Sequence, residues 1–231
     1  MKKTLALALA LLAAAPSGAW AAIGCTLSNP AEDLKYLFPA MTSYREELKE
    51  LTKLPDGKAA YAGLPDRIGG KLDPVYESFE TPYTVYAVFQ GKKKIGVVHG
   101  VNVPGQGGVI QVFLATDPAS GAVEKFFFQR LESPAAKALR DKAFRAKFEG
   151  LTLADFYKHD YYAKVPPADA SNETDRVALI GEPKGLPADG RADYEASLRG
   201  VRKNLVLLDL FVYGRRFEPF YERARQAAAA K

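Results

Sequence analysis

The amino-acid sequence predicts an α+β fold, in which two successive β-hairpins form an antiparallel sheet that helices cover. Two observations carry this prediction. Between residues 83 and 131, runs of β-branched and aromatic residues alternate with short turn segments, which is the pattern of hairpins. After residue 133, apolar residues recur at helical spacing instead. The sheet is therefore expected at the centre of the fold, with the helices around it.

Four runs make up the predicted sheet. Gly91-Lys92-Lys93 separates the first two runs, and Asp117-Pro118-Ala119-Ser120-Gly121 separates the last two with residues that are typical of tight turns. Strands joined by such short connections pair in the antiparallel sense. The four strands are expected at residues 83–89, 95–103, 109–115 and 123–131.

Residues 22–74 precede the sheet and are predicted to be a helical and loop segment. A helix begins at Asn29-Pro30 and ends at Pro39. Residues 43–54 are predicted as a second, amphipathic helix because their leucines recur at helical spacing. Residues 55–74 are rich in Pro, Gly and Asp, which predicts a loop.

Helices are expected again after the sheet. Residues 134–148 and 194–213 each show an apolar stripe at helical spacing, and 153–157 is predicted as a short helical piece. Between them, residues 164–193 are dominated by Pro, Gly, Asp and Asn, which predicts a long surface loop. The last segment, 215–231, is predicted to be a basic and alanine-rich tail.

The first 21 residues have the pattern of a secretory signal peptide. Lys2 and Lys3 are followed by an apolar run from residue 4 to residue 15 and then by Ala19-Trp20-Ala21, an A-x-A cleavage site. The apolar run is shorter than the roughly 20 residues that span a bilayer. We therefore expect cleavage near Ala21 and a periplasmic or secreted protein.

Cys25 leaves a second possibility for localisation. It is the only cysteine, and Ala22-Ile23-Gly24-Cys25 is similar to a lipobox, in which the cysteine would be acylated after export. The alternative expectation is therefore a lipoprotein anchored through Cys25. With one cysteine the chain forms no internal disulfide, so an ordinary apolar core must hold the fold.

Composition and motifs narrow the classes of function. Loss of residues 1–21 takes the formal net charge from +5 to +3, a surplus that affects solubility and is no signal for nucleic acid. No run after the signal peptide is apolar enough to cross a membrane. His99 and His159 are the only histidines, and the sequence contains no nucleophile elbow, phosphate-binding loop or zinc-ligand spacing. We therefore predict no catalytic residue and no metal site.

The order of parts between residues 83 and 150 resembles a known family. A glycine-rich stretch, Gly105-Gln106-Gly107-Gly108, enters a strand, and the next strand ends at Glu132-Ser133-Pro134-Ala135. A helix that ends at Phe148-Glu149-Gly150 follows. This arrangement is similar to the FMN-binding domain of the Rnf complex G subunit and the Nqr complex C subunit, which has Glu-Thr-Pro-Gly at the strand end. Residues 193–208 resemble the family more loosely, and the whole FMN-binding-like domain is expected at 75–214.

The resemblance implies a flavin site. It suggests that the glycine stretch and the 132–135 corner lie beside the ring of FMN. Ser197, in Tyr194-Glu195-Ala196-Ser197, falls near the position where the family attaches the FMN phosphate to the threonine of a Ser-Gly-Ala-Thr motif. Because that motif is changed here, the resemblance implies non-covalent FMN, with Arg199 and its basic neighbours on the phosphate. The cofactor-binding residues expected from the resemblance are Gly105, Gly107, Gly108, Glu132, Ser133, Pro134, Ser197 and Arg199.

The residues themselves leave other readings open. Glycines at a strand end often mark a bulge or a crossover between strands. Arg199, Arg202 and Lys203 are equally compatible with the solvated face of an amphipathic helix. Two functions therefore remain at this stage. The predicted function is an exported, non-covalent FMN-binding electron carrier that acts among periplasmic or membrane-bound redox proteins. The alternative is a cofactor-free exported interaction or accessory domain that retains the fold.

Overall fold

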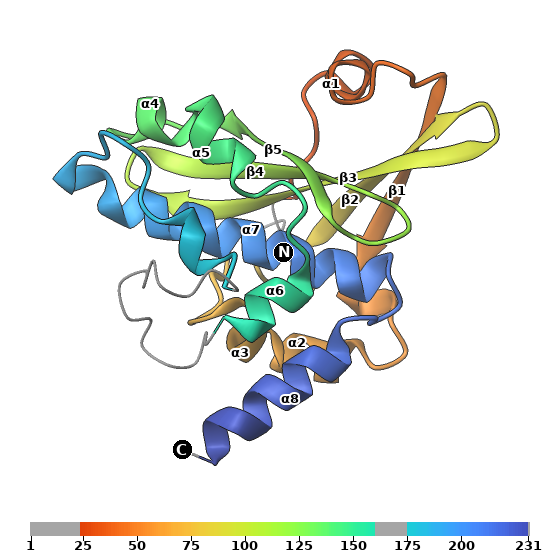
Figure 1. Ribbon diagram of the computed structural model, residues 1–231. Coiled ribbons are helices and arrows are strands. Elements are labelled where there is room, and N and C mark those ends of the chain that lie inside the picture. The colour runs from red at the N-terminus through yellow and green to blue at the C-terminus, as the bar shows by residue number, and fades with distance from the viewer. Residues whose placement is uncertain (1–23, 160–174, 231) are drawn as a thin grey trace, which may run out of the picture.

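The computed structural model describes residues 24–159 and 175–230, and its centre is a five-stranded antiparallel sheet (Figure 1). The strands lie side by side in chain order, β1-β2-β3-β4-β5. The predicted α+β class and both predicted hairpins are confirmed. The predicted signal peptide lies outside the described residues. The strands are β1 (Ser43–Glu50), β2 (Pro82–Gln90), β3 (Lys93–Gly105), β4 (Gly108–Thr116) and β5 (Val123–Arg130).

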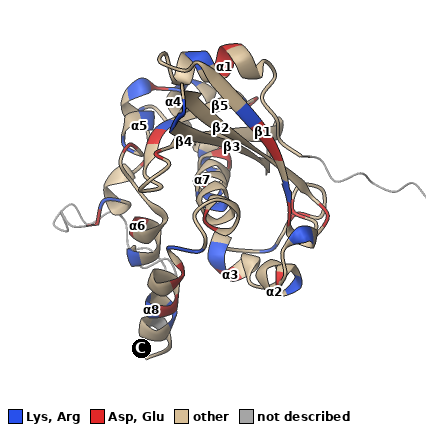
Figure 2. Cartoon of the chain, turned by 90° about the vertical axis from the view of Figure 1, so that its right-hand side faces the viewer, with Lys and Arg blue, Asp and Glu red and all other residues tan. Residues whose placement is uncertain are grey.

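Strand β1 replaces the helix that was predicted at residues 43–54, and that prediction is wrong. β1 pairs with β2 along its whole length, from Ser43 opposite Phe89 to Glu50 opposite Pro82. β2 is apolar and needs a partner for the main-chain hydrogen bonds of its outer edge. Tertiary pairing therefore outweighs a helical pattern in β1, which carries both basic and acidic residues (Figure 2). Leu48, which belonged to the predicted apolar stripe, is 63% exposed. Only the end of the segment is helical, as the 3₁₀ turn η1 (Leu51–Lys53).

A long helix covers one face of the sheet. Helix α7 (Arg191–Phe211) runs beneath the sheet in Figure 1 and packs against β3 and β4. The sequence predicted this helix at 194–213. Gly200 allows the close packing, because a Cβ there would lie 2.8 Å from a methyl group of Val112. We call this side of the sheet the α7 face.

The opposite side, which we call the second face, is covered differently. The predicted helix at Asn29-Pro30 is confirmed as α1 (Pro30–Leu37), which lies above the sheet in Figure 1. Phe38 follows it and covers Gly96, where a Cβ would lie 2.2 Å from the phenyl ring. Beside α1, residues 24–28 lie against the sheet and bury the side chains of Cys25 and Leu27.

Four shorter helices form a layer below α7 (Figure 1). They are α2 (Gly57–Ala62), α3 (Leu64–Ile68), α6 (Leu153–Lys158) and α8 (Glu218–Ala229). The prediction of a loop at 55–74 is therefore wrong for α2 and α3, and the prediction of a tail at 215–231 is wrong for α8. Phe217 and Tyr221 are buried, and Arg67 of α3 forms an ion pair with Glu218. These contacts bind the C-terminal helix to the rest of the fold.

The helix predicted at 134–148 is divided in two. It forms α4 (Ala136–Leu139) and α5 (Lys142–Ala146), because Asp141 has an extended ψ of 135° and caps α5 by accepting a hydrogen bond from Phe144 N. The predicted apolar stripe is nevertheless buried. In the predicted 164–193 loop, the residues up to 174 lie outside the described ones, and the rest contains the 3₁₀ turns η2 (Ala178–Ile180) and η3 (Ala188–Gly190).

Candidate functional site

The glycine-rich stretch forms the turn between β3 and β4. Gly105 pairs with Gly108, so Gln106 and Gly107 form a two-residue loop. Gly108 has φ +117°, a backbone conformation that side chains rarely adopt. A Cβ on Gly107 would lie 2.1 Å from the carbonyl oxygen of Glu132, so no side chain fits there. The glycines are therefore required by the turn and by its contact with the 132–135 corner.

The 132–135 corner connects β5 to α4. The Ser133 hydroxyl accepts a hydrogen bond from Ala135 N at 3.0 Å, which fixes the turn, while Pro134 is exposed. The Glu132 carboxylate points to solvent and pairs with Arg130. The structure thus brings Gly107 and Glu132 together, as the resemblance implies, but it joins them by direct backbone contact.

Ser197 lies in the interface between α7 and the sheet. Its side chain is 1% exposed, and its hydroxyl donates to the carbonyl oxygen of Asp193 at 2.7 Å. Asp193 in turn accepts a hydrogen bond from Gln106 N at 2.8 Å, which links the start of α7 to the glycine turn. The position that the resemblance assigns to phosphate attachment is therefore inside the fold, and its donor is already used.

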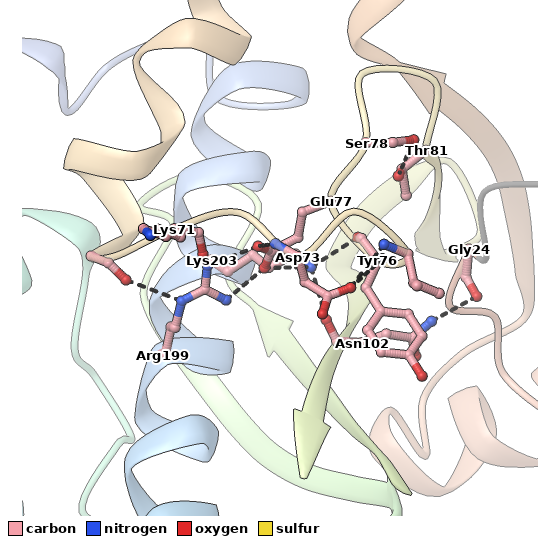
Figure 3. Close-up of polar contacts among 12 residues, drawn as sticks. Gly24, Lys71, Asp73, Tyr76, Glu77, Ser78, Thr81, Asn102, Arg199 and Lys203 are labelled. Atoms are coloured by element: carbon pink, nitrogen blue, oxygen red, sulfur yellow. Dashed lines mark hydrogen bonds and ion pairs between the residues drawn. The ribbon is translucent and has the colours of Figure 1, made fainter.

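Arg199 makes an ion pair with a carboxylate of its own chain. Its guanidinium donates two hydrogen bonds to Glu77, at 2.6 and 2.8 Å, and further bonds to the carbonyl oxygens of Gly69 and Lys71 (Figure 3). Glu77 is 1% exposed. Such a bidentate pair is the strong form of a charge-assisted hydrogen bond. The arginine that was predicted to hold a phosphate thus holds the segment between α3 and β2.

Lys203, one turn further along α7, completes the cluster. Its ammonium lies 3.1 Å from the Glu77 carboxylate and donates to the carbonyl oxygens of Tyr76 and Asn102 (Figure 3). Only 2% of the lysine side chain is exposed. The reading of this helix side as a solvated face is therefore wrong, because Arg202 is also buried. We call Glu77, Arg199 and Lys203 the ionic cluster.

Burial and neighbouring charges shift the pKa values of the ionic cluster in opposite directions. Burial lowers the pKa of Lys203 to about 8, although the nearby Glu77 carboxylate favours its charged form. For Glu77, burial alone would raise the pKa, but the Arg199 hydrogen bond and the Lys203 charge outweigh it, and the pKa is lowered. Glu77 is therefore ionised and its negative charge is shared between two cations.

A small cleft lies beside the ionic cluster. It has a volume of about 260 Å³ and is lined by the 71–74 turn, Val103, Pro104, Ala196 and Arg199. Small-molecule sites usually have roughly 300–1,000 Å³. The lining is mostly apolar, with Lys71 and Arg199 as its cations. The cleft thus borders Arg199, one of the residues that the resemblance assigns to FMN.

The described residues do not fit FMN as they are folded. The Ser197 hydroxyl is buried, the Arg199 guanidinium is bound to Glu77, and the carbonyl of Glu132 occupies the space next to Gly107. A flavin phosphate would have to compete with a buried carboxylate for Arg199. The ring would have to enter a cleft that is smaller than usual ligand sites.

His99 has a structural role in the contact between β3 and α7. It is fully buried on the α7 face, and its Nδ1 donates to the side-chain oxygen of Asn204 at 2.9 Å. Burial lowers its pKa to about 4, with the Asn204 hydrogen bond opposing this shift. Within residues 24–159 and 175–230, no group of three or more His, Cys, Asp or Glu side chains could hold a metal ion. None of the described helices is long and apolar enough to cross a membrane.

Two residues that matter for the faces of the sheet, one on each face, were not found from the sequence. Glu77 lies in a segment that was treated as connection, and a single carboxylate there gives no pattern. Gln129, on the second face, follows three consecutive phenylalanines in β5 and was treated only as part of a strand. Each becomes visible only when the fold places it opposite its partner.

The chain matches no known protein-family model and no curated protein. The class that the fold and the site define is an α+β protein, with a five-stranded antiparallel sheet and a buried ionic cluster between that sheet and α7. The resemblance to FMN-binding domains stays a prediction from the sequence.

Proposed function

We propose that this chain is an exported interaction domain that retains an FMN-binding-domain-like fold and works without flavin. The observation that carries the proposal is the bidentate ion pair between Arg199 and Glu77. It uses the arginine that would otherwise bind a phosphate, and Glu77 neutralises Lys203 as well. Breaking such a buried pair costs about 3–5 kcal/mol, which an incoming phosphate would have to offset.

Export is part of this proposal and rests on the signal-peptide pattern of residues 1–21. The lipoprotein alternative receives less support, because the Cys25 side chain is 3% exposed and packs in an apolar cluster beside the sheet. A lipid on this thiol would require Cys25 to leave the cluster. We expect the intact mass of the exported protein to correspond to a chain that begins at Ala22. A diacylglyceryl adduct on Cys25 would instead establish the lipoprotein.

One observation favours a second candidate, the non-covalent FMN electron carrier with periplasmic or membrane-bound redox partners. The cleft beside Ala196 is mostly apolar and has two cationic side chains at its edge, Lys71 and Arg199. This is the chemistry that a flat ring with a phosphate needs. For FMN to bind there, the 69–77 segment would have to move away from α7.

An absorbance spectrum of the purified protein, followed by titration with FMN, separates the two candidates. We expect a colourless protein whose fluorescence titration with FMN shows no saturable binding. Flavin absorbance that survives gel filtration would overturn the proposal. Arg199→Gln and, as a matched exposed control, Arg225→Gln in α8 identify the site in that case. The second candidate requires Arg199→Gln to weaken FMN binding while Arg225→Gln does not.

A further inference from the structure

Residues 24–28, which we call the N-terminal segment, lie on the second face like an extended peptide on a receptor. Cys25 and Leu27 are buried, at 3% and 4% exposure, whereas Thr26 and Ser28 face solvent. This alternation is that of a β-strand, although the segment belongs to no ladder of the sheet. The segment is therefore held by something other than strand pairing.

Side chains of the sheet make four hydrogen bonds to this segment, all of them to its main chain. Asn102 donates to Gly24 O at 3.0 Å, and Leu27 N donates to the Tyr86 hydroxyl at 3.0 Å. Gln129 makes the other two, donating to the carbonyl of residue 26 at 3.0 Å and accepting from the amide of residue 28 at 2.8 Å.

The Gln129 contacts are those that a neighbouring strand would make. The carbonyl of residue 26 and the amide of residue 28 lie on the same side of an extended chain, and one side-chain amide satisfies both. Gln111 fixes this amide by accepting from Gln129 at 2.9 Å, and it donates to Asn102 at 3.2 Å. We call Asn102, Gln111 and Gln129 the amide row.

We propose that the amide row and the apolar sites of Cys25 and Leu27 form a peptide-binding groove, which takes an extended segment of another protein in exchange for residues 24–28. The partner it fits is an extended segment without charged side chains, in which a small residue and a leucine lie two positions apart. The inference rests on the proposed function, because it names the partner class of the interaction domain.

The chemistry of the contacts favours exchange. Recognition through main-chain groups does not depend on sequence, as in other proteins that bind extended peptides. Specificity comes from the two buried side chains, and neither is charged. Each of the four contacts is a hydrogen bond between neutral groups, and such bonds contribute little net stability individually. A peptide with the same pattern therefore makes every contact that the segment of the chain itself makes.

Cys25 reports directly whether the segment is in place, so the full chain can be tested. Burial raises the pKa of its thiol to about 12, and thiol reagents react with the thiolate, so labelling requires the segment to leave the sheet. The measurement is the rate at which Ellman's reagent labels Cys25 while the peptide acetyl-Gly-Ser-Thr-Leu-Ser-amide is added. The peptide carries serine in place of the cysteine, so it does not consume the reagent.

We expect the peptide to raise the labelling rate several-fold and saturably. A peptide with aspartate in place of its leucine should have no effect. Leu27→Ala weakens only the internal segment, so the response should shift to lower peptide concentration. Gln129→Ala weakens both occupants to a similar extent, so it should raise the rate without peptide and reduce the fold-increase that saturating peptide produces. Gln226→Ala, at an exposed position of α8, should behave as the wild type does.

The inference is overturned if millimolar peptide leaves the rate unchanged in both the wild type and Leu27→Ala while circular dichroism shows both folded. It is equally overturned if the aspartate peptide acts as strongly as the leucine peptide. FMN absorbance tests the proposed function at the α7 face, whereas Cys25 labelling tests the groove on the second face. The two measurements are independent, so either proposal can fail while the other is still tested.

Discussion

The two faces of the sheet are closed in different ways. The α7 face is covered by a 21-residue helix and contains buried charges, which Glu77 joins to the loop before β2. The second face is covered by α1, which has eight residues, and by an extended segment that neutral amides hold. Both faces are apolar near their centres.

This difference suggests separate roles for the two faces: the α7 face stabilises the fold, and the second face can release the segment that covers it. Moving the 69–77 segment away from α7 would separate Glu77 from Arg199 and Lys203, and breaking a buried ion pair is expensive when a partner stays buried. Opening the second face near residues 24–28 replaces hydrogen bonds between neutral groups with bonds to water, and it costs mainly the burial of two side chains. We therefore expect the second face to open locally while the α7 face opens only when the protein unfolds.

The largest expected effect is that of Glu77→Gln. Removing this carboxylate leaves Arg199 and Lys203 without their shared anion, so we expect a loss of about 3–5 kcal/mol in the free energy of unfolding. Urea denaturation measures it. Glu132→Gln is the matched control, because Glu132 is exposed and its loss should change stability by less than about 0.5 kcal/mol. Equal stability of the two variants would contradict the contrast between the faces.

The α7 face should also make stability depend on pH through His99. Its pKa is lowered to about 4 in the folded protein, so between pH 6.5 and pH 4 the unfolded chain binds more protons than the folded one. The free energy of unfolding should therefore fall as the pH is lowered through this range, by up to roughly 3 kcal/mol from His99 alone.

His99→Gln removes this titration while leaving a group that can bond to Asn204. The variant should lose less stability than the wild type between pH 7 and pH 4. Asp209, whose pKa burial raises to about 6, acts in the opposite direction, but it is present in both proteins and cancels in the comparison. Parallel stability curves for the two proteins would show that His99 does not contribute.

Two leucines with the same burial compare the faces directly. Leu205 of α7 is 3% exposed and Leu27 of the N-terminal segment is 4% exposed. Leu→Ala substitutions in cores cost about 2–5 kcal/mol, and the cost depends on how well the site can collapse. We expect Leu205→Ala to cost about 1–2 kcal/mol more than Leu27→Ala, because the segment can move into the space while α7 cannot. Denaturation of both variants decides it, and a larger cost for Leu27→Ala would reverse the comparison.

The smallest effect is expected for Gln129→Ala, about 1 kcal/mol in the free energy of unfolding, since the bonds it makes are between neutral groups. Hydrogen exchange should show that faster exchange is confined to the amides of residues 27 and 28. Faster exchange throughout the sheet would mean that the segment stabilises the whole fold and does not open by itself.

The pattern of neighbouring residues in the sequence was sufficient to predict the strands at the centre of the sheet and the helix that covers them. The strands from residue 82 to residue 130 and helix α7 lie close to their predicted positions, because hairpin turns and a long apolar stripe are encoded by neighbouring residues. The helix predicted at 43–54 failed for the opposite reason. Its Arg, Glu, Leu and Lys residues favour a helix locally, but pairing with β2 outweighed that preference.

The site residues divide in the same way. The sequence alone places Gly105, Gly107 and Gly108 at the entry to a strand and Glu132 at the end of the next one. Only the tertiary structure decided that Glu132 lies against Gly107, that Ser197 is buried, and that Arg199 is bound by Glu77, which is 122 residues away in the chain. A charged side chain has no fixed role until the fold sets its distance to other charges and to water, because burial and pairing together determine its energy.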